Sequence, residues 1–261
     1  MKTIQYTLAD GIATITFDEP GSAVNTMCED WQRDLTEVTA QVVQDKDAIR
    51  GIILASNKST FFAGADLKGL MRLTPADAPR IFREIEQNKK NFRTLETLGK
   101  PVVSCINGAA LGGGWEVALV GHCRIAVDDP KIQLGLPEIT LGLIPGASGI
   151  TKMTRLLGLM GAQPYILESR LFNPRQALDM GLVHELVADA GALRGAALTW
   201  IDPPGSPAPG VSTASVTCTS TPWPGSEGSG VSATMAVAVA ARPTTWSTPA
   251  ETLGSKPPPP G

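Results

Sequence analysis

The sequence predicts a layered α/β domain followed by a segment of a different kind. Over residues 1–190, short apolar runs alternate with stretches of helical periodicity, an order typical of α/β or α+β proteins. A run of three glycines joins one apolar run to a helix. Beyond residue 190 the charged residues and leucines become scarce.

The elements follow one another with clear turn signals. An antiparallel hairpin is predicted first, because two apolar runs flank the turn Asp10-Gly11. Thr26 is the expected N-cap of the first helix, and Gly99-Lys100-Pro101 ends a long amphipathic one. The predicted strands are residues 4–8, 12–17, 51–55, 102–106 and 124–127. The predicted helices are residues 26–43, 75–98, 115–120, 150–157 and 174–180.

Composition narrows the classes of function. The chain has 261 residues, of which 43% are hydrophobic and 18% charged, so a sizeable core is available. A formal net charge of −3 argues against a nucleic-acid-binding protein, which would usually be basic. No apolar run reaches the roughly 20 residues of a membrane span, and the N-terminus has no apolar signal region. We therefore expect a cytoplasmic protein without a membrane span.

Metal and histidine chemistry have little support in the sequence. The four cysteines are scattered without a C-x-x-C pair, so no zinc site or disulfide framework is indicated. Only His122 and His184 are present, and neither lies in a motif. Proton transfer would therefore fall to carboxylates.

Residues 191–261 form a tail rich in Pro, Gly, Ser, Thr and Ala. These five types make up 45 of residues 201–261, and only 6 of the 47 charged residues of the chain lie beyond residue 190. Such a segment cannot bury enough apolar surface to offset its ordering entropy. We expect residues 1–190 to be one domain and the tail to be disordered. A shifted reading frame or an interdomain linker would explain its composition.

The glycine run Gly112-Gly113-Gly114 is the first sign of a functional site. Glycines at the start of a helix let an anionic oxygen approach free backbone N–H groups. A tight turn between a closely packed strand and helix explains the run as well. A dinucleotide site is a weaker alternative, because the G-x-G-x-x-G pattern is absent.

Two glutamates follow the glycines in different surroundings. Glu116 lies two residues after Gly114, in the first turn of the predicted helix. Glu138 lies in an apolar stretch, where its pKa should be raised. Two such carboxyl groups can divide the roles of acid and base. Each glutamate alone is also explained as a helix-terminal acid.

Three motifs together resemble the enoyl-CoA hydratase/isomerase (crotonase) family. They are Phe61-Phe62-Ala63-Gly64-Ala65-Asp66-Leu67-Lys68, Asn107-Gly-Ala-Ala-Leu-Gly-Gly-Gly-Trp-Glu116, and Leu136-Pro137-Glu138-x-x-x-Gly142-x-x-Pro145-Gly146. The opening, up to Asn25, is most similar to the N-terminal hydratase part of multifunctional fatty-acid oxidation α-subunits. The resemblance covers about 190 residues. It implies a crotonase-like spiral of strand–strand–helix turns.

The resemblance also implies roles for individual residues. The backbone N–H groups of Ala65 and Gly113 would form an oxyanion hole for a thioester carbonyl. Glu116 matches the family's general base, and Glu138 matches the residue that handles the proton at the α-carbon. Further substrate contacts are implied at Ala63, Asp66, Gly112, Gly114, Pro137 and Gly149. No metal or cofactor is implied, since coenzyme A is part of the substrate.

The implied function is hydration of 2-enoyl-CoA thioesters in β-oxidation. Both glutamates are present, which favours a hydratase, and 3-enoyl/2-enoyl isomerase activity could accompany it. Homo-oligomers (trimers or hexamers) and a thiolase subunit are the implied partners. The alternative is a catalytically impaired CoA-thioester-binding remnant, because the helices with which relatives cover the acyl pocket cannot be found in the tail.

Four residues depart from the family pattern or invite a second explanation. Ser148 replaces a glycine in the usual Pro-Gly-x-Gly-Gly and could narrow the site. Trp115 is larger than usual, and we expect core packing rather than a place in the acyl pocket. Lys68 is expected to be a solvated surface lysine rather than a CoA phosphate ligand. Asp66 is explained equally well as a helix-start acid or as part of the oxyanion loop.

Overall fold

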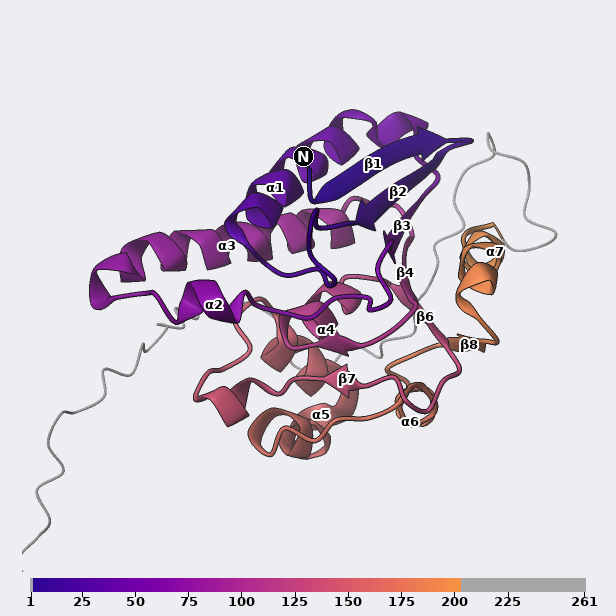
Figure 1. Ribbon diagram of the computed structural model, residues 1–261. Coiled ribbons are helices and arrows are strands. Elements are labelled where there is room, and N and C mark those ends of the chain that lie inside the picture. Colours follow the sequence, from indigo (N-terminus) through magenta and orange to yellow (C-terminus); the bar gives the residue numbers. More distant parts are fainter. Residues whose placement is uncertain (1, 203–261) are drawn as a thin grey trace, which may run out of the picture.

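A six-stranded sheet forms the centre of the computed structural model, which describes residues 2–202. The strand order is β1-β2-β3-β4-β6-β8 (Figure 1). The strands are β1 Ile4–Ala9, β2 Ile12–Phe17, β3 Gly51–Ser56, β4 Val102–Ile106, β6 Cys123–Val127 and β8 Glu185–Val187. The hairpin β1–β2 is antiparallel, as predicted, and every later pair in this sheet is parallel.

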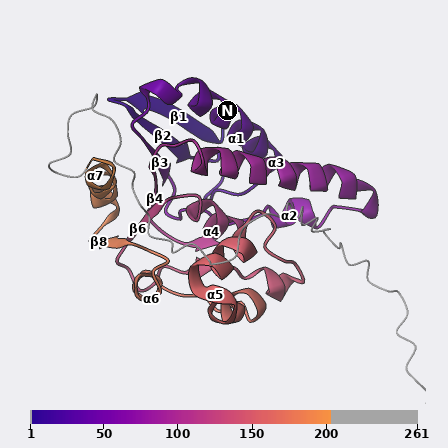
Figure 2. The same cartoon turned by 180° about the vertical axis from the view of Figure 1, so that it is seen from behind.

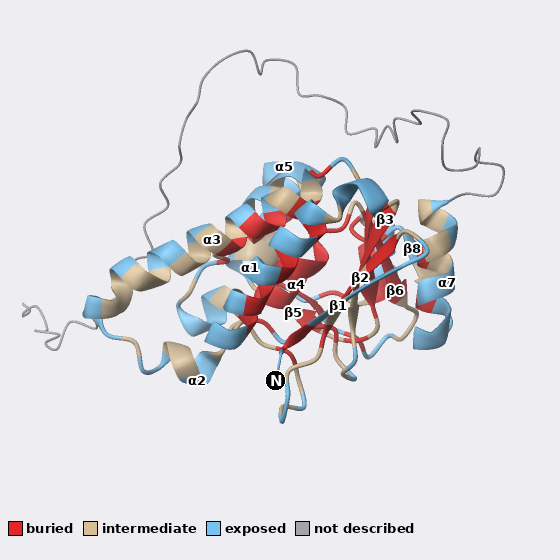
Figure 3. Cartoon of the chain, turned by 90° about the horizontal axis from the view of Figure 1, so that it is seen from above, coloured by how far each residue is buried: buried red, intermediate tan, exposed pale blue. Residues whose placement is uncertain are grey.

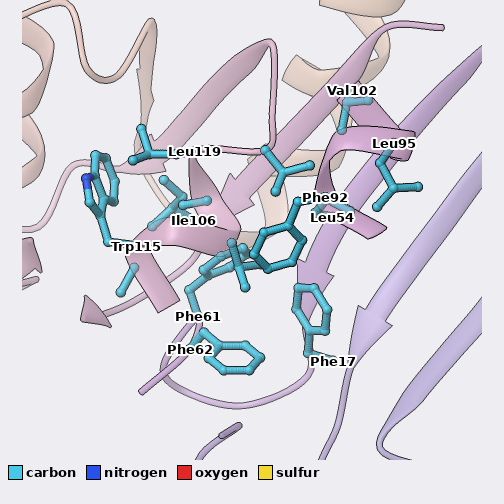
Figure 4. Close-up of a cluster of buried hydrophobic side chains, with 14 of the residues drawn as sticks. Phe17, Leu54, Phe61, Phe62, Phe92, Leu95, Val102, Ile106, Trp115 and Leu119 are labelled. Carbon is cyan, nitrogen blue, oxygen red and sulfur yellow. The ribbon is translucent and has the colours of Figure 1, made fainter. Parts of the chain in front are cut away.

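Both faces of the inner strands β2, β3, β4 and β6 are buried, and successive side chains along each strand point to opposite faces. In β3, Ile52 and Leu54 belong to the larger core, whereas Ile53 belongs to a smaller core on the other face. Figure 4 shows the aromatic part of the larger core, where the Phe17 ring packs edge-on against Phe61 and Phe62 at centroid distances of 5.9 and 5.4 Å.

The larger core is covered by two long helices that lie side by side (Figures 1 and 2). They are α1 Glu29–Gln44 and α3 Ala78–Glu96. Each buries one apolar stripe, as their sequence periodicity predicts. The expected cap of the first helix is wrong. Thr26 instead donates its N–H and its hydroxyl to Glu19 Oε2, both at 2.8 Å, and the N-cap position is Cys28.

The smaller core is covered by α7 Ala190–Ile201, on the opposite side of the sheet from α1 and α3 (Figure 3). Leu193 and Ala197 are one helical turn apart and are both buried. The helix begins where the Asp189 side chain accepts a hydrogen bond from the Ala192 N–H at 3.1 Å.

The predicted domain boundary at residue 190 is therefore too early for the described part of the chain. Residues 190–201 are an integral layer of the fold, because the apolar face of β4 and β6 requires a cover. The rest of the predicted tail, from residue 203 onward, lies outside the described residues.

A second layer lies below the main sheet in the view of Figure 1. The glycine run and both glutamates belong to its short helices or to the turns directly before them. Its strands β5 Ala110–Leu111 and β7 Leu134–Gly135 form a parallel pair. Its helices are α4 Gly113–Ala118, η3 Glu138–Leu141, α5 Gly149–Leu167 and α6 Pro174–Asp179. The remaining short helices are η1 Lys46–Ala48, α2 Leu67–Leu70 and η2 Pro75–Asp77.

The helix α5 extends further than predicted. The expected segment 150–157 ends where Gly158 breaks the helical geometry, with φ 73° and ψ 166°. A second helical stretch then continues to Leu167. Among residues 2–202, no helix is long and apolar enough to cross a membrane.

Candidate active site

Two chain segments, distant in sequence, lie side by side at the glycine run. Phe62 and Ala110 form an isolated parallel bridge, and the Leu111 N–H donates to the Phe62 carbonyl at 3.1 Å. A Cβ on Gly114 would lie only 2.1 Å from that carbonyl oxygen. The close packing explains Gly114, and it brings the segment of Ala65 next to Gly113.

The backbone N–H groups of Ala65 and Gly113 donate to no acceptor within residues 2–202. Gly113 is the first residue of α4, where an N–H has no partner inside the helix. A Cβ on Gly64 would lie 3.5 Å from the Gly113 nitrogen, so the two loops meet at these donors. Two unused donors on neighbouring loops can bind one carbonyl oxygen.

Gly112 occupies a backbone conformation that other residues avoid. Its φ is +56° and its ψ is −127°, and its N–H donates to the Gly135 carbonyl at 2.8 Å. A Cβ at this position would lie 3.0 Å from Glu138 Oε1. The missing side chain therefore leaves the space that the Glu138 carboxyl group occupies.

Glu116 is buried and its carboxylate is fixed by backbone donors. Its side chain comes from the first turn of α4 and is 2% exposed. Its Oε1 accepts the N–H groups of Ala147 at 2.8 Å, Ser148 at 2.7 Å and Gly149 at 2.6 Å. Burial raises the pKa of Glu116, and these three donors and the Lys152 ammonium oppose the rise.

Glu138 lies at the start of η3, in a less enclosed position. Its Oε2 is buried and finds no hydrogen-bond partner among the described residues. Burial, and secondly the charge of Glu116, raise the pKa of Glu138 to about 7. The carboxyl group can therefore hold or release a proton near neutral pH, as its apolar sequence context predicted.

The other residues with predicted substrate contacts lie around this centre. Gly149 donates to Glu116, and a Cβ on it would lie 3.1 Å from the Glu116 Cγ. Pro137 is the N-cap residue of η3, directly before Glu138. Ala63 is exposed on the loop before Ala65. The structure therefore brings all of the predicted glycines and both glutamates into one region.

The structure bears on the alternatives left open for Asp66 and Trp115. Asp66 caps α2, where its carboxylate accepts the Lys68 N–H at 3.1 Å. Trp115 is fully buried, and its indole N–H points to the Met153 sulfur at 3.3 Å, so core packing is confirmed. Lys68 itself is exposed.

Sequence reasoning missed three side chains that shape the region. Asn25 is buried, and its side-chain amide donates to Ser56 Oγ at 2.9 Å and to the Phe61 carbonyl at 3.2 Å. Its backbone carbonyl accepts the Ala63 N–H at 2.9 Å. Met27 places its sulfur beside Gly113. Lys152 donates to the Leu119 carbonyl at the end of α4, and its charge acts on the Glu116 carboxylate. Of the three, only Asn25 stood in the resembling opening, whereas Met27 and Lys152 carry no sequence signal.

Two surface hollows of the described region lie away from this site. One lies between α1 and α3, beside Glu84 and Asn88, and the other beside α7, near Arg50 and Arg194. Neither includes Glu116 or Glu138.

Comparison with known proteins decides the family. The sequence model described as enoyl-CoA hydratase/isomerase matches residues 7–203. This chain belongs to the enoyl-CoA hydratase/isomerase family. The resemblance of the three motifs is thus confirmed, and the match extends through α7.

Proteins similar to this chain in sequence include α-subunits of the fatty acid oxidation complex. The subunit from Shewanella oneidensis is 41% identical over 180 residues, which are 68% of this chain and 25% of that protein. The subunit from Shewanella halifaxensis is 40% identical over 196 residues, 74% of this chain and 27% of that protein. The chain spans about a quarter of the length of these curated relatives.

Solved structures of similar proteins confirm the crotonase-type fold. DspI from Pseudomonas aeruginosa superposes with a TM-score of 0.68 at 31% identity, covering 77% of this chain and 79% of that chain. An enoyl-CoA hydratase from Bacillus anthracis gives a TM-score of 0.68 at 29% identity, covering 77% and 75%.

Proposed function

We propose that this member of the enoyl-CoA hydratase/isomerase family adds water to the double bond of 2-enoyl-CoA thioesters. One observation carries the proposal. Two carboxyl groups in different surroundings, Glu116 and Glu138, lie beside two unused backbone donors, Ala65 and Gly113. A reaction that develops negative charge on a carbonyl oxygen, and moves one proton in and one proton out, uses all four groups.

In the proposed reaction, the thioester oxygen accepts both backbone N–H groups. Glu116 removes a proton from water as the water oxygen forms a bond with the β-carbon. The electron pair of the double bond moves toward the thioester carbonyl, where Ala65 and Gly113 stabilise the resulting oxyanion. Glu138 then gives its proton to the α-carbon. Solvent restores both carboxyl groups, so the step balances without a metal ion or a redox cofactor.

The division of roles follows from the surroundings of the two carboxyl groups. Three backbone donors point at Glu116 Oε1, and hydrogen bonds of this kind favour the carboxylate, the form that a base requires. Glu138 has no such donors to its Oε2, and its pKa of about 7 leaves it protonated in part of the enzyme at neutral pH. It therefore suits the role of proton donor.

The test is replacement of each glutamate by glutamine in the full chain. We expect Glu116→Gln and Glu138→Gln each to lower the hydration rate of crotonyl-CoA by about 10²–10⁴. The double variant should lose less than the product of the single losses, since the two residues act as a unit. Thioester binding should change little, because the backbone donors remain.

The matched control is Glu37→Gln, since the Glu37 side chain is exposed and pairs with the exposed Lys2. This variant should keep full activity. Normal turnover in either Glu116→Gln or Glu138→Gln would refute the assignment.

Further parts of the proposal come from the relatives. We propose that the natural setting is β-oxidation, that 3-enoyl/2-enoyl isomerase activity accompanies hydration, and that the chain forms homo-oligomers and contacts a thiolase subunit. A longer 2-enoyl-CoA and a 3-enoyl-CoA, assayed beside crotonyl-CoA, would test the activities.

A CoA-thioester-binding remnant is the second candidate. It is supported by the two unused backbone donors, Ala65 and Gly113, which suffice to bind a thioester oxygen and do not by themselves require turnover. Binding of a saturated acyl-CoA in calorimetry, together with no hydration of any enoyl-CoA, would favour it over the hydratase.

A further inference from the structure

Lys152 is a partly buried cation that the proposed reaction does not use directly. It lies in the first turn of α5, and its N–H donates to the Ser148 carbonyl at 3.0 Å. Its ammonium group donates to the carbonyl of Leu119, the C-cap of α4, at 2.6 Å, and pairs with Glu96 at the end of α3. The side chain thus joins three helices at one point.

These contacts lie close to the hydrogen bonds that hold Glu116. Backbone donors of residues 147–149, at the N-terminal boundary of α5, hold the Glu116 carboxylate, which belongs to α4. Lys152, less than one turn further along α5, holds the other end of α4 through Leu119. The N-terminal boundary of α5 is therefore joined to α4 at two points, Glu116 and Leu119, so a change at Lys152 would move the donors that point at Glu116.

The charges around Glu116 make Lys152 the relevant cation. Burial raises the pKa of Glu116, and the positive charge of Lys152 in α5 opposes that rise. Glu138 of η3 is the neighbouring carboxyl group. Lys152 is itself faced by Glu96 from α3 and by Arg124 from β6. Burial lowers the pKa of Lys152, and the ion pair with Glu96 opposes that shift and favours the charged ammonium.

We propose that Lys152 is a positioning residue for the general base. It keeps the α5 backbone donors on Glu116 and supplies the positive charge that keeps the Glu116 carboxylate ionised in a buried site. The inference rests on the proposed function for its kinetic consequence, but the interaction itself can be measured without turnover.

The first measurement is the pH profile of kcat/KM with crotonyl-CoA. Lys152→Met and Lys152→Gln both remove the charge, and the glutamine keeps a donor for the Leu119 carbonyl. We expect the acidic limb to move to higher pH in both, so that kcat/KM below the limb falls about tenfold for each pH unit of displacement. KM should change little, since Ala65 and Gly113 are untouched.

Two comparisons separate charge from packing. Lys152→Arg retains the charge and should restore the position of the acidic limb. Lys131→Met removes an exposed lysine and should change nothing. If Lys152→Met and Lys152→Gln lower thermal stability but leave the acidic limb in place, Lys152 is only structural and the proposal is wrong.

The second measurement does not depend on catalysis. In full-length protein labelled with ¹³C at the glutamate carboxyl carbons, the Glu116 signal is assigned by its loss in Glu116→Gln. Its titration midpoint should rise in Lys152→Met or Lys152→Gln and return in Lys152→Arg. An unchanged midpoint overturns the proposal. A shifted midpoint in a protein that hydrates no enoyl-CoA would refute the proposed function and leave this inference intact.

Discussion

Two glutamates of identical chemistry acquire different properties from their surroundings. Glu116 is enclosed and receives three backbone donors, whereas Glu138 has a buried oxygen without a partner among the described residues. The charge on Glu116 also raises the pKa of Glu138. The pair therefore titrates as a coupled system, and a measured pKa belongs to both.

The pH dependence of hydration follows from the raised pKa of Glu138. As proton donor, Glu138 must be protonated, a condition met below about pH 7 and lost as the pH rises through that value. We expect kcat/KM for crotonyl-CoA to fall above about pH 7. The residual activity of Glu138→Gln should lack this basic limb. A wild-type profile that is flat to pH 9 would contradict the role of Glu138.

Ser148 stores backbone strain next to Glu116. Its φ of 155° with ψ −3° is a conformation that favours glycine, the residue common in the family at this position. We expect Ser148→Gly to stabilise the protein by about 1 kcal/mol, since strain of roughly 1–3 kcal/mol exceeds the entropic cost of a glycine. Thermal unfolding should show a Tm about 2–4 °C higher.

Ser148→Ala is the control for that measurement. Alanine removes the hydroxyl, which has no partner among the described residues, but keeps the Cβ and its strain. An alanine variant as stable as the glycine variant would assign the gain to the hydroxyl instead of the backbone.

At the scale of elements, the strand-to-helix turn requires glycine at two positions for different physical reasons. A Cβ on Gly113 would lie 2.6 Å from Met27 Sδ, the flexible end of a side chain that can move. A Cβ on Gly114 would lie 2.1 Å from the Phe62 carbonyl oxygen, which is backbone and cannot yield without separating the two segments. Gly113 therefore serves the donor site, and Gly114 serves packing.

We expect Gly113→Val to fold but to lose hydration of crotonyl-CoA, because its side chain and the displaced Met27 would obstruct the donor. Gly114→Ala should lose stability, by about 1–3 kcal/mol or more. Circular dichroism and thermal unfolding measure the fold, and the hydration assay measures the site. A folded Gly113→Val with normal turnover would show that Gly113 is only a packing glycine.

On the scale of the molecule, the described chain leaves apolar side chains exposed over one region. This η3–α5 surface comprises residues that η3, α5 and the loop between them present to solvent. They are Ile139, Leu141, Ile144, Leu156, Leu159, Met160 and Leu167. Leu159 is 74% exposed and Met160 76%. Exposed apolar residues in such number on neighbouring segments are typical of an interaction surface.

We expect the protein to self-associate through the η3–α5 surface. Sedimentation at micromolar concentration should give a mass that is a multiple of the 27.3 kDa chain. The double substitution Leu159→Glu with Met160→Glu should shift the population toward the monomer, whereas Lys90→Glu on the exposed side of α3 should not. A wild-type protein that stays monomeric would refute the expected homo-oligomer.

The sequence by itself determined the order of the longer elements up to α6, together with the glycines and glutamates of the candidate site. Strands such as β3 and β4 are buried on both faces, so they appear as continuous apolar runs, and α1 and α3 have one apolar stripe each. The glycine run and both glutamates stood in motifs of fixed spacing. Such signals are local, and they can be read without knowing the path of the chain.

Only the tertiary structure decided which groups surround each side chain. The three donors to Glu116 come from residues 31 to 33 positions further along the chain, and Lys152 reaches α3 and α4 from α5. The helix α7 was assigned to the tail because its sequence is poor in charge, yet it docks through Leu193 and Ala197 on a face of the sheet that would otherwise be open. Contacts of this kind depend on how distant segments are brought together, and a short helix gains most of its stability from such docking.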